Sequence, residues 1–317
     1  MVAPSPTLAE TLVAAGYEVL GHLHRSRGFD VYDAWSNIRR TRVVVKAPRP
    51  DRLDDHRLLR RLECEGRLLS GFTHPHILRG YEVLPAPLPA VVTETLRGET
   101  LSHLLDRRRL TAAEVAVLGL QLSSALAYIH DHGYLHLDLK PANIVVDGGR
   151  AIVVDLSLAR RPGRGTRGLG TWGYLAPEQA LGRRLDAATD VWGVGVVLFE
   201  ALTDRAPFGD DTADDDEDDS HYATDDEDPA FYPQLEARAP RIRTLRRVPA
   251  PLASAVDASL EPDPRRRPSL EELAAALEGV PGAGSPRAVR AHSGTGTPDA
   301  RGHNGGARVE SIDDGDG

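Results

Sequence analysis

The sequence has 317 residues, enough for one large domain or for two lobes with an ample core. Its formal net charge is −9, but 12 acidic residues and no Lys or Arg lie from Asp210 to Asp228, so the remainder is near neutral and gives no indication of a general affinity for nucleic acid. The single cysteine, Cys64, excludes a disulfide framework and a cysteine-based zinc site.

The first residues lack the basic segment and the long apolar run that a signal peptide requires. No uninterrupted apolar stretch approaches the length of about 18 residues that indicates a membrane span. We therefore expect a cytoplasmic protein with neither a membrane nor a nucleic-acid partner.

In chain order, short β-branched runs predict strands over residues 17–23, 30–35, 42–46, 77–84, 90–94, 144–146 and 151–154. Helical patterns cover residues 7–15, 54–71, 111–133, 190–202 and a last segment after Ser269. The pairs Thr111 with Glu114 and Ser269 with Glu272 have the spacing of capping boxes. The helix over 190–202 is apolar nearly all round, which predicts that it is buried.

Lysine is almost absent, since Lys46 and Lys140 are accompanied by 36 arginines. Arginine is present wherever a positive charge alone is sufficient. The two remaining lysines therefore indicate places where a compact point charge meets a phosphate. Asparagine is similarly rare, and Asn143 is one of three.

One acid lies on the apolar face of the helix over residues 54–71. Three leucines define this face: Leu58, Leu62 and Leu69. Glu65 falls on the same face, and an unpaired buried charge is costly, so it needs a partner, for which Lys46 is the natural candidate. The alternative acid, Glu63, points to nearly the opposite side of the helix.

A predicted hairpin over residues 144–154, with its turn at 147–150, gathers polar groups at one end. Asp138 and Asn143 precede its first strand, and Asp155 follows its second. Two carboxylates and an amide form a hard-oxygen site suited to Mg²⁺ and phosphates. A zinc site at the nearby histidines 130, 132 and 136 is disfavoured, because no carboxylate or cysteine completes the spacing.

These segments carry a resemblance to a known family. His136–Asn143 matches the H-x-D-L-x-x-x-N catalytic loop of protein kinases, and Asp155-Leu156-Ser157 occupies the place of D-F-G. Val43–Lys46 is similar to V-A-I-K, and Gly170–Glu178 to G-T-x-x-Y-x-A-P-E. From about Tyr17 to Leu277 the chain resembles eukaryotic-like serine/threonine protein kinases of bacterial or archaeal type.

The resemblance implies an α+β, bilobal protein kinase fold with a small β-rich N-lobe and a larger, mainly helical C-lobe. The implied divisions are an N-terminal extension (1–16), the N-lobe (17–96), the C-lobe (97–280) with an acidic insert (210–228), and a disordered tail (281–317). For the insert, a solvated loop is favoured over a docking site for a basic partner.

The resemblance also implies a role for each matching residue. Asp138 would accept the proton of a Ser or Thr hydroxyl on a protein substrate, and Lys140 would steady the γ-phosphate of ATP. Asn143 and Asp155 would hold Mg²⁺, or Mn²⁺ in its place. The implied ATP-binding residues are Leu23, Val31, Val44, Lys46, Glu65, Thr93, Glu94, Leu96 and Val145. Residues implied to organise the loop and the substrate platform are His136, Thr171, Glu178, Asp190 and Arg267, with Glu178 paired to Arg267 and Asp190 anchoring the catalytic-loop backbone.

Two departures from the family pattern bear on function. Registering Val31 on the family valine places His24, Ser26 and Phe29 where the glycines of the phosphate-covering loop belong. Solvated arginines at 25 and 27 are favoured over phosphate contacts from them. Leu137 replaces the arginine of H-R-D, which predicts activity that does not require activation-loop phosphorylation.

Two alternatives to a protein kinase remain open from the residues. A pseudokinase, an ATP-binding scaffold without catalysis, is suggested by the missing glycines. A small-molecule phosphotransferase of the aminoglycoside-kinase kind shares the H-x-D…N loop, but the motifs at 171–178 and 263–268 argue against it.

Overall fold

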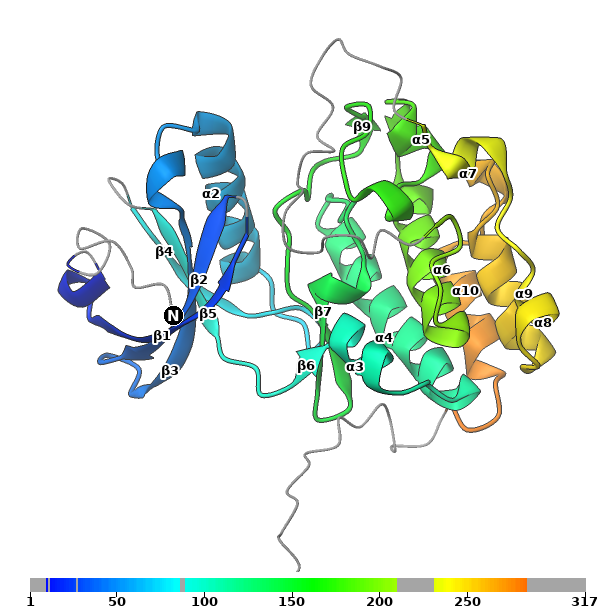
Figure 1. Ribbon diagram of the computed structural model, residues 1–317, viewed down its shortest axis with the longest axis horizontal. Helices are drawn as coiled ribbons and strands as arrows, with labels where there is room; N and C mark the ends of the chain where they lie inside the picture. Colours follow the sequence, from blue (N-terminus) through cyan, green and yellow to red (C-terminus); the bar gives the residue numbers. More distant parts are fainter. Residues whose placement is uncertain (1–9, 11, 27, 86–88, 210–230, 284–317) are drawn as a thin grey trace, which may run out of the picture.

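The computed structural model describes residues 10, 12–26, 28–85, 89–209 and 231–283. A lobe built on one sheet is followed by a larger, mainly helical lobe (Figure 1). The expected bilobal α+β kinase architecture is therefore present. The acidic run at 210–228 and the tail from residue 284 lie outside the described residues, whereas Ala283 is 7% exposed and packs in the core.

The small lobe is an antiparallel sheet in the order β1-β2-β3-β5-β4 with one long helix against it. Its elements are β1 (Tyr17–Arg25), β2 (Phe29–Ser36), β3 (Thr41–Pro48), α2 (His56–Gly71), β4 (Gly80–Leu84) and β5 (Ala90–Glu94). Strand alternation divides β3 between two faces: Val43 and Val45 are fully buried, while Lys46 faces the other side. Leu12, from the predicted N-terminal helix, is buried with the first set, so this helix covers the outer face of the sheet.

One predicted strand is shorter than expected. The run over 77–84 pairs in the sheet only from Gly80 onward. Ile77 instead forms an isolated parallel bridge with Val153 of the other lobe, and Leu78 N donates to Val153 O at 2.9 Å. The apolar residues that suggested an early strand start therefore connect the two lobes.

The large lobe surrounds two apolar helices, α4 and α6. Its strands are β6 (Glu99–Thr100), β7 (Ile144–Asp147), β8 (Arg150–Val153), β9 (Gly163–Arg164) and β10 (Arg184–Leu185). Its helices are α3 (Leu101–Arg107), α4 (Ala112–Asp131), α5 (Pro177–Ala180), α6 (Ala187–Thr203), α7 (Pro233–Glu236), α8 (Ile242–Leu245), α9 (Ala250–Ser259) and α10 (Leu270–Glu278). Both predicted capping boxes are formed, at the starts of α4 and α10.

Helix α4 packs against α6, α10 and β8. Among the described residues, it is the one helix long and apolar enough to cross a membrane, and 56% of its most apolar window is buried inside the fold. Packing therefore accounts for its apolar composition.

The hairpin of β7 and β8 is present as predicted, with Asp147 opposite Arg150. Beyond its open end, Val154 N donates to Asn143 O at 3.0 Å, which places Asn143 beside the residue that precedes Asp155. On the other side, Leu135 exchanges two backbone hydrogen bonds with Arg160, at 2.7 and 3.1 Å. The loop 136–143 is thereby fixed between the hairpin and the following segment.

Candidate active site

The catalytic loop is held by a buried carboxylate from α6. Asp190, 2% exposed, accepts hydrogen bonds from the backbone N–H groups of His136 and Leu137, both at 2.8 Å. His130 Nε2 lies 2.7 Å from the same carboxylate. Leu137 has φ +69°, a left-handed conformation that a branched side chain adopts at a cost. The anchoring role predicted for Asp190 is therefore visible, and it stabilises a strained turn directly before Asp138.

The electrostatics of Asp190 follow from these contacts. Burial by itself would raise its pKa, but the hydrogen bond and charge of His130 and the contacts of His136 lower it, so the group is ionised. An ionised carboxylate accepts stronger hydrogen bonds from backbone N–H groups than a neutral acid does. His136 itself is 1% exposed, and its Nδ1 accepts from Asp138 N at 3.1 Å.

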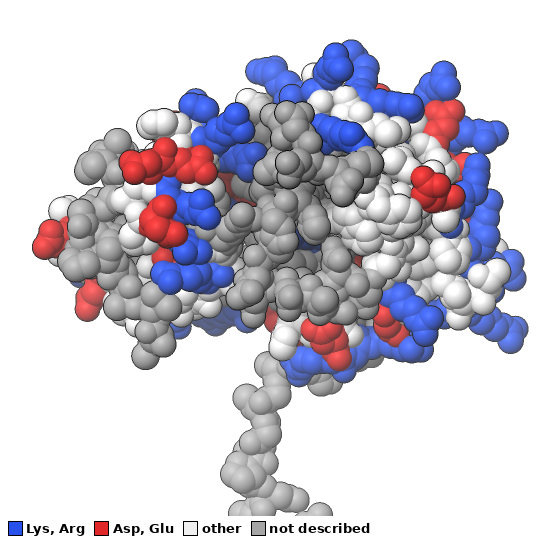
Figure 2. Space-filling view, turned by 45° about the horizontal axis from the view of Figure 1, so that its top comes forward, with Lys and Arg blue, Asp and Glu red and all other residues white. Residues whose placement is uncertain are grey.

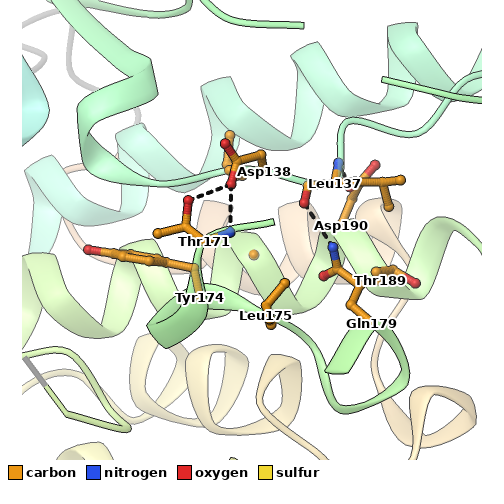
Figure 3. Close-up of a pocket in the computed structure, with 10 residues that line it drawn as sticks. Leu137, Asp138, Thr171, Tyr174, Leu175, Gln179, Thr189 and Asp190 are labelled. Atoms are coloured by element: carbon orange, nitrogen blue, oxygen red, sulfur yellow. Dashed lines mark hydrogen bonds between the residues drawn. The ribbon is translucent and has the colours of Figure 1, made fainter. Parts of the chain in front are cut away.

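The side chain of Asp138 is fixed from two sides, and Figure 3 shows its contacts with Thr171. Its Oδ1 accepts from the Thr171 hydroxyl at 2.7 Å and from Thr171 N at 3.1 Å. Its Oδ2 accepts from Asn143 Nδ2 at 3.2 Å. The carboxylate is only half-buried, so a hydroxyl group can reach it from the open side.

Asn143 and Asp155 supply oxygen atoms suited to a divalent cation. Both amide hydrogens of Asn143 are used on Asp138, at 2.9 Å to its carbonyl and 3.2 Å to its carboxylate, which orients the amide oxygen. Asp155 accepts from Ser157 N at 2.7 Å. One carboxylate and one amide match Mg²⁺, which usually takes one or two protein carboxylates together with substrate phosphates. Within the described ranges no group of three His, Cys, Asp or Glu forms a separate metal cage.

Lys46 of β3 lies among acids from both lobes. Its Nζ is 2.9 and 3.0 Å from the two carboxylate oxygens of Glu65 on α2, and 3.6 Å from Asp155 Oδ2. Glu65 is 2% exposed, whereas Glu63 is exposed on the opposite side of the helix. The predicted choice of Glu65 over Glu63 as the partner of Lys46 is confirmed.

Burial and charge compete within this cluster. Burial would lower the pKa of Lys46, but the charges of Asp155 and Glu65 raise it above its ordinary value. Burial raises the pKa of Glu65, and Lys46 opposes that shift. Burial would also raise the pKa of Asp155, but Lys46 and the Ser157 amide lower it to about 2. A charged lysine and an ionised Asp155 therefore face each other across the lobes at neutral pH.

The remaining predicted ATP-binding residues lie on the small-lobe sheet and on β7. Val31 is directly opposite Lys46, and Val44 is opposite Thr93, so these four share the sheet face that carries Lys46. Glu94 N donates to Arg79 O at 3.0 Å, so this N–H is not available to a ligand. Leu96 and Val145 are half-buried. Leu23 lies in the irregular part of β1 and is 56% exposed.

The turn between β1 and β2 is where the structure departs most from a glycine loop. Ser26 closes it: Ser26 N donates to Phe29 O at 2.8 Å, and Phe29 N donates to Ser26 Oγ at 3.1 Å. The ring of Phe29 lies with its centroid 4.8 Å from Lys46 Nζ, a cation–π contact. Arg25 binds Asp30 through two hydrogen bonds of 2.7 and 2.9 Å. Arg25 is exposed, as expected of a solvated arginine, but its guanidinium is also held by the buried Asp30.

The substrate platform is fixed to the core by a buried ion pair. Arg267 donates to both carboxylate oxygens of Glu178, at 2.7 and 2.9 Å, and the two side chains are 0% and 5% exposed. The same guanidinium also donates to Ala188 O at 2.9 Å and lies 4.9 Å from the ring centroid of Trp192. The predicted pairing of Glu178 with Arg267 is confirmed.

Gln179 is a site residue that the sequence reasoning missed. Its Nε2 donates to Leu137 O at 2.9 Å (Figure 3) and to Leu169 O at 3.2 Å, and its Oε1 accepts from Ala176 N at 3.1 Å. One buried amide therefore connects the catalytic loop to the segment that carries Thr171. The adjacent Leu137 packs with Leu135 and Leu185, which is an apolar contact where the family has an arginine.

Two lobes joined at a lysine–glutamate–aspartate cluster, with an oriented aspartate on a buried loop, define a chain of the protein kinase fold. The model of the protein kinase domain family matches residues 18–276, and the chain belongs to this family.

Curated relatives agree with the resemblance to bacterial serine/threonine kinases. Serine/threonine-protein kinase PkaA of Streptomyces coelicolor is 33% identical over 249 residues, which cover 75% of this chain and 43% of PkaA. Serine/threonine-protein kinase PknB of Mycolicibacterium smegmatis is 34% identical over 52% of this chain and 29% of its own length. Maternal embryonic leucine zipper kinase of Xenopus laevis is 31% identical over 54% of this chain and 27% of its own. The matches span less than half of each of these relatives.

Proposed function

We propose that the chain transfers the γ-phosphate of ATP to Ser or Thr hydroxyls of a protein substrate. The observation that carries the proposal is the Asp138 carboxylate, which Thr171 and Asn143 orient while one side stays open. The similarity to proteins named serine/threonine kinases supports the choice of acceptor.

Each residue that matches a kinase motif is given one part in this reaction. Asp138 accepts the proton of the attacking hydroxyl and orients it. Lys140 is half-buried two residues further along the loop and steadies the transferred phosphate. Lys46, held by Glu65, binds the α- and β-phosphates as a point charge. Phosphoryl transfer depends mostly on such positioning and charge stabilisation.

Asn143 and Asp155 would hold Mg²⁺, or Mn²⁺, beside the phosphates. The bound cation would neutralise charge that develops on the phosphate oxygens. Because Asp155 stays ionised to about pH 2, these two side chains offer the oxygen ligands at every physiological pH.

Activity is proposed to be independent of activation-loop phosphorylation. In kinases that use an arginine in the catalytic loop, a phosphate orders the segment by ion pairing. Here Leu137 contacts Leu185 of β10 in an apolar cluster, and Gln179 bonds the loop to the segment. These contacts need no added charge.

A pseudokinase is the second candidate, and one observation favours it. The Phe29 ring lies 4.8 Å from Lys46 Nζ, beside the ammonium that would meet the nucleotide phosphates. A nucleotide-binding scaffold without transfer would tolerate this arrangement.

The decisive experiment is incubation of the full chain with labelled ATP and Mg²⁺ or Mn²⁺, with a generic protein substrate. Lys46→Met and Asp138→Ala are the test variants, and Arg243→Ala, an exposed change on α8, is the matched control. We expect label from the parent and the control, and a loss of at least about 10²-fold in Asp138→Ala. Equal label in parent and Asp138→Ala would reject the assignment, and nucleotide binding without any label would favour the scaffold.

Further proposals concern the location of the protein, its partners and the limits of its lobes. We propose a cytoplasmic location, no nucleic-acid or membrane partner, and the lobe limits 17–96 and 97–280. A basic partner at 210–228 concerns residues outside the described ranges; a pull-down with and without amide substitution of its acids would test it.

A further inference from the structure

The surface around β9 and β10 is rich in arginine. Six arginines lie there, five exposed and one half-buried: Arg160, Arg161, Arg164, Arg167, Arg183 and Arg184. We call this set the arginine surface. The one acid between residues 160 and 184 is Glu178, which is buried on Arg267. Figure 1 shows β9 and α5 at the top of the larger lobe, and Figure 2, in which this top comes forward, shows many blue side chains on the upper part of that lobe.

These arginines differ from others on the described surface, many of which have an acidic partner. Arg42 binds Asp33, and Arg108 binds Glu114 at 2.9 Å. By contrast, no member of the arginine surface forms an ion pair with a described residue. Their interactions are instead of other kinds, such as Arg160 Nη2 donating to Arg164 O at 3.1 Å. Within the described ranges, no neighbouring acid neutralises their charge.

Two members of the arginine surface face each other. Arg164 and Arg184 are directly opposite in the antiparallel pair of β9 and β10, so their side chains leave the same face of this ladder. Like charges in directly opposite positions destabilise a strand pair. An anion bound between the two guanidinium groups would relieve this repulsion, so the pair favours an anionic ligand.

The arginine surface is joined by backbone hydrogen bonds to the catalytic residues. Gly165 N donates to Arg183 O, and Arg183 N donates to Glu178 O, both at 2.8 Å. Arg160 exchanges backbone hydrogen bonds with Leu135, three residues before Asp138. The arginine surface and the loop that carries Asp138 are therefore linked parts of the large lobe.

We propose that the arginine surface binds carboxylate side chains flanking the acceptor, so that the protein substrate is an acidic segment. The proposal rests on the proposed function, because it concerns the substrate of the same site. Guanidinium groups pair with carboxylates through two parallel hydrogen bonds, which suits this recognition.

The test uses matched synthetic peptides with one acceptor Thr and four flanking Glu, Gln or Arg residues. The full chain is first treated with a phosphatase, so that a phosphate on Thr166 does not occupy the arginines. We expect kcat/KM for the Glu peptide to exceed that for the Gln peptide by about tenfold, since two or three exposed ion pairs each contribute roughly two- to fivefold. The preference should fall as salt rises, because exposed charges are screened.

Two double variants assign the preference to the arginine surface. Arg164→Gln/Arg184→Gln should remove most of it through KM for the peptide, with KM for ATP and activity on the Gln peptide unchanged. The melting temperature of this variant should equal or exceed that of the parent, because the repulsion between Arg164 and Arg184 is removed. The matched control, Arg243→Gln/Arg247→Gln, changes two exposed arginines at and beyond α8 and should keep the preference.

The chain's own acids at 210–228 could compete for the arginine surface, so a form with all 12 replaced by their amides is measured in parallel. Equal kcat/KM for Glu and Gln peptides in both forms would overturn this proposal while leaving the proposed function standing. An acidic preference that survives Arg164→Gln/Arg184→Gln would also overturn it. Transfer to no peptide and no protein would instead reject the proposed function.

Discussion

Replacing Gln179 by leucine removes the amide that joins the catalytic loop to the substrate platform. The volume is nearly conserved, but the two hydrogen bonds donated to Leu137 O and Leu169 O and the one accepted from Ala176 N are lost. Gln179 is 4% exposed, so these backbone groups do not gain bulk water in exchange.

The structure sets the magnitude of the loss. A buried polar group without a partner costs roughly 1–3 kcal/mol. A narrow recess lined by Leu137, Leu175 and Gln179 lies beneath the loop (Figure 3), and entry of water there would bring each group toward the lower limit. Three groups at about 1 kcal/mol each give a loss of about 3 kcal/mol in the free energy of unfolding. A displacement of Asp138 by about 1 Å would in addition lower kcat by about 10²-fold.

The assay separates catalysis from folding. We would measure kcat, KM for ATP and the melting temperature of Gln179→Leu and Gln179→Glu, the second of which keeps the shape but cannot donate to Leu137 O. The matched control is Gln121→Leu, because Gln121 also bridges backbone groups, donating to Gly149 O at 3.2 Å and accepting from Ala151 N at 2.6 Å. We expect all three variants to lose stability, but kcat to fall only in the Gln179 pair, with KM for ATP within about twofold.

One result would refute this reasoning. If both Gln179 variants lost stability as Gln121→Leu does and yet kept the parental kcat, the amide would be a structural element without influence on Asp138.

Three further changes have defined outcomes. Phe29→Gly removes the ring beside Lys46, so the ammonium no longer has to give up a cation–π contact when it meets the phosphates. KM for ATP, measured by ATP titration, should fall by about two- to tenfold, the equivalent of that contact. An increase in KM would make the ring part of the nucleotide site. Thr166→Ala should keep kcat within about twofold because the Leu137 contact is apolar, and loss of activity with an intact circular dichroism spectrum would contradict this. Arg267→Met strands a buried carboxylate and should cost about 3–5 kcal/mol, seen as a fall of roughly 6–20 °C in melting temperature; an unchanged value would show that the pair is not stabilising.

The polar pairs could be predicted wherever a periodic pattern forced a partner on a buried group. Glu65 lies on the leucine stripe of α2, so it had to be buried, and the buried acid required a cation. Asp190 lies in the first turn of the apolar helix α6, and its bonds to the catalytic-loop backbone were implied by the resemblance to protein kinases. In both cases the sequence shows the apolar surroundings that make an unpaired charge costly.

Gln179 could not be predicted because its partners are backbone groups of segments far apart in the sequence. Every residue has a backbone carbonyl, so the sequence does not show which carbonyls need a side-chain donor. The amide that donates to Leu137 O and Leu169 O therefore cannot be told from any other polar residue after the A-P-E motif. Ile77 shows the same limit for strands: its apolar character is genuine, but the bridge to Val153 that uses it depends on the packing of two lobes.

The β1–β2 turn shows that missing glycines do not by themselves mean a missing phosphate lid. Glycine loops are flexible, and ordering them around a nucleotide costs conformational entropy. Here Ser26 and Phe29 share two hydrogen bonds and Asp30 holds Arg25, so the described residues on either side of the turn are fixed without a ligand. At Gly28 a Cβ would lie 2.5 Å from Leu58 Cδ1 of α2, so a larger residue there requires the Leu58 side chain to move. We therefore expect this turn to adapt less to a nucleotide than a glycine loop does, but to lose less conformational entropy when the nucleotide binds. The position of the Phe29 ring beside Lys46 then determines the affinity for the nucleotide.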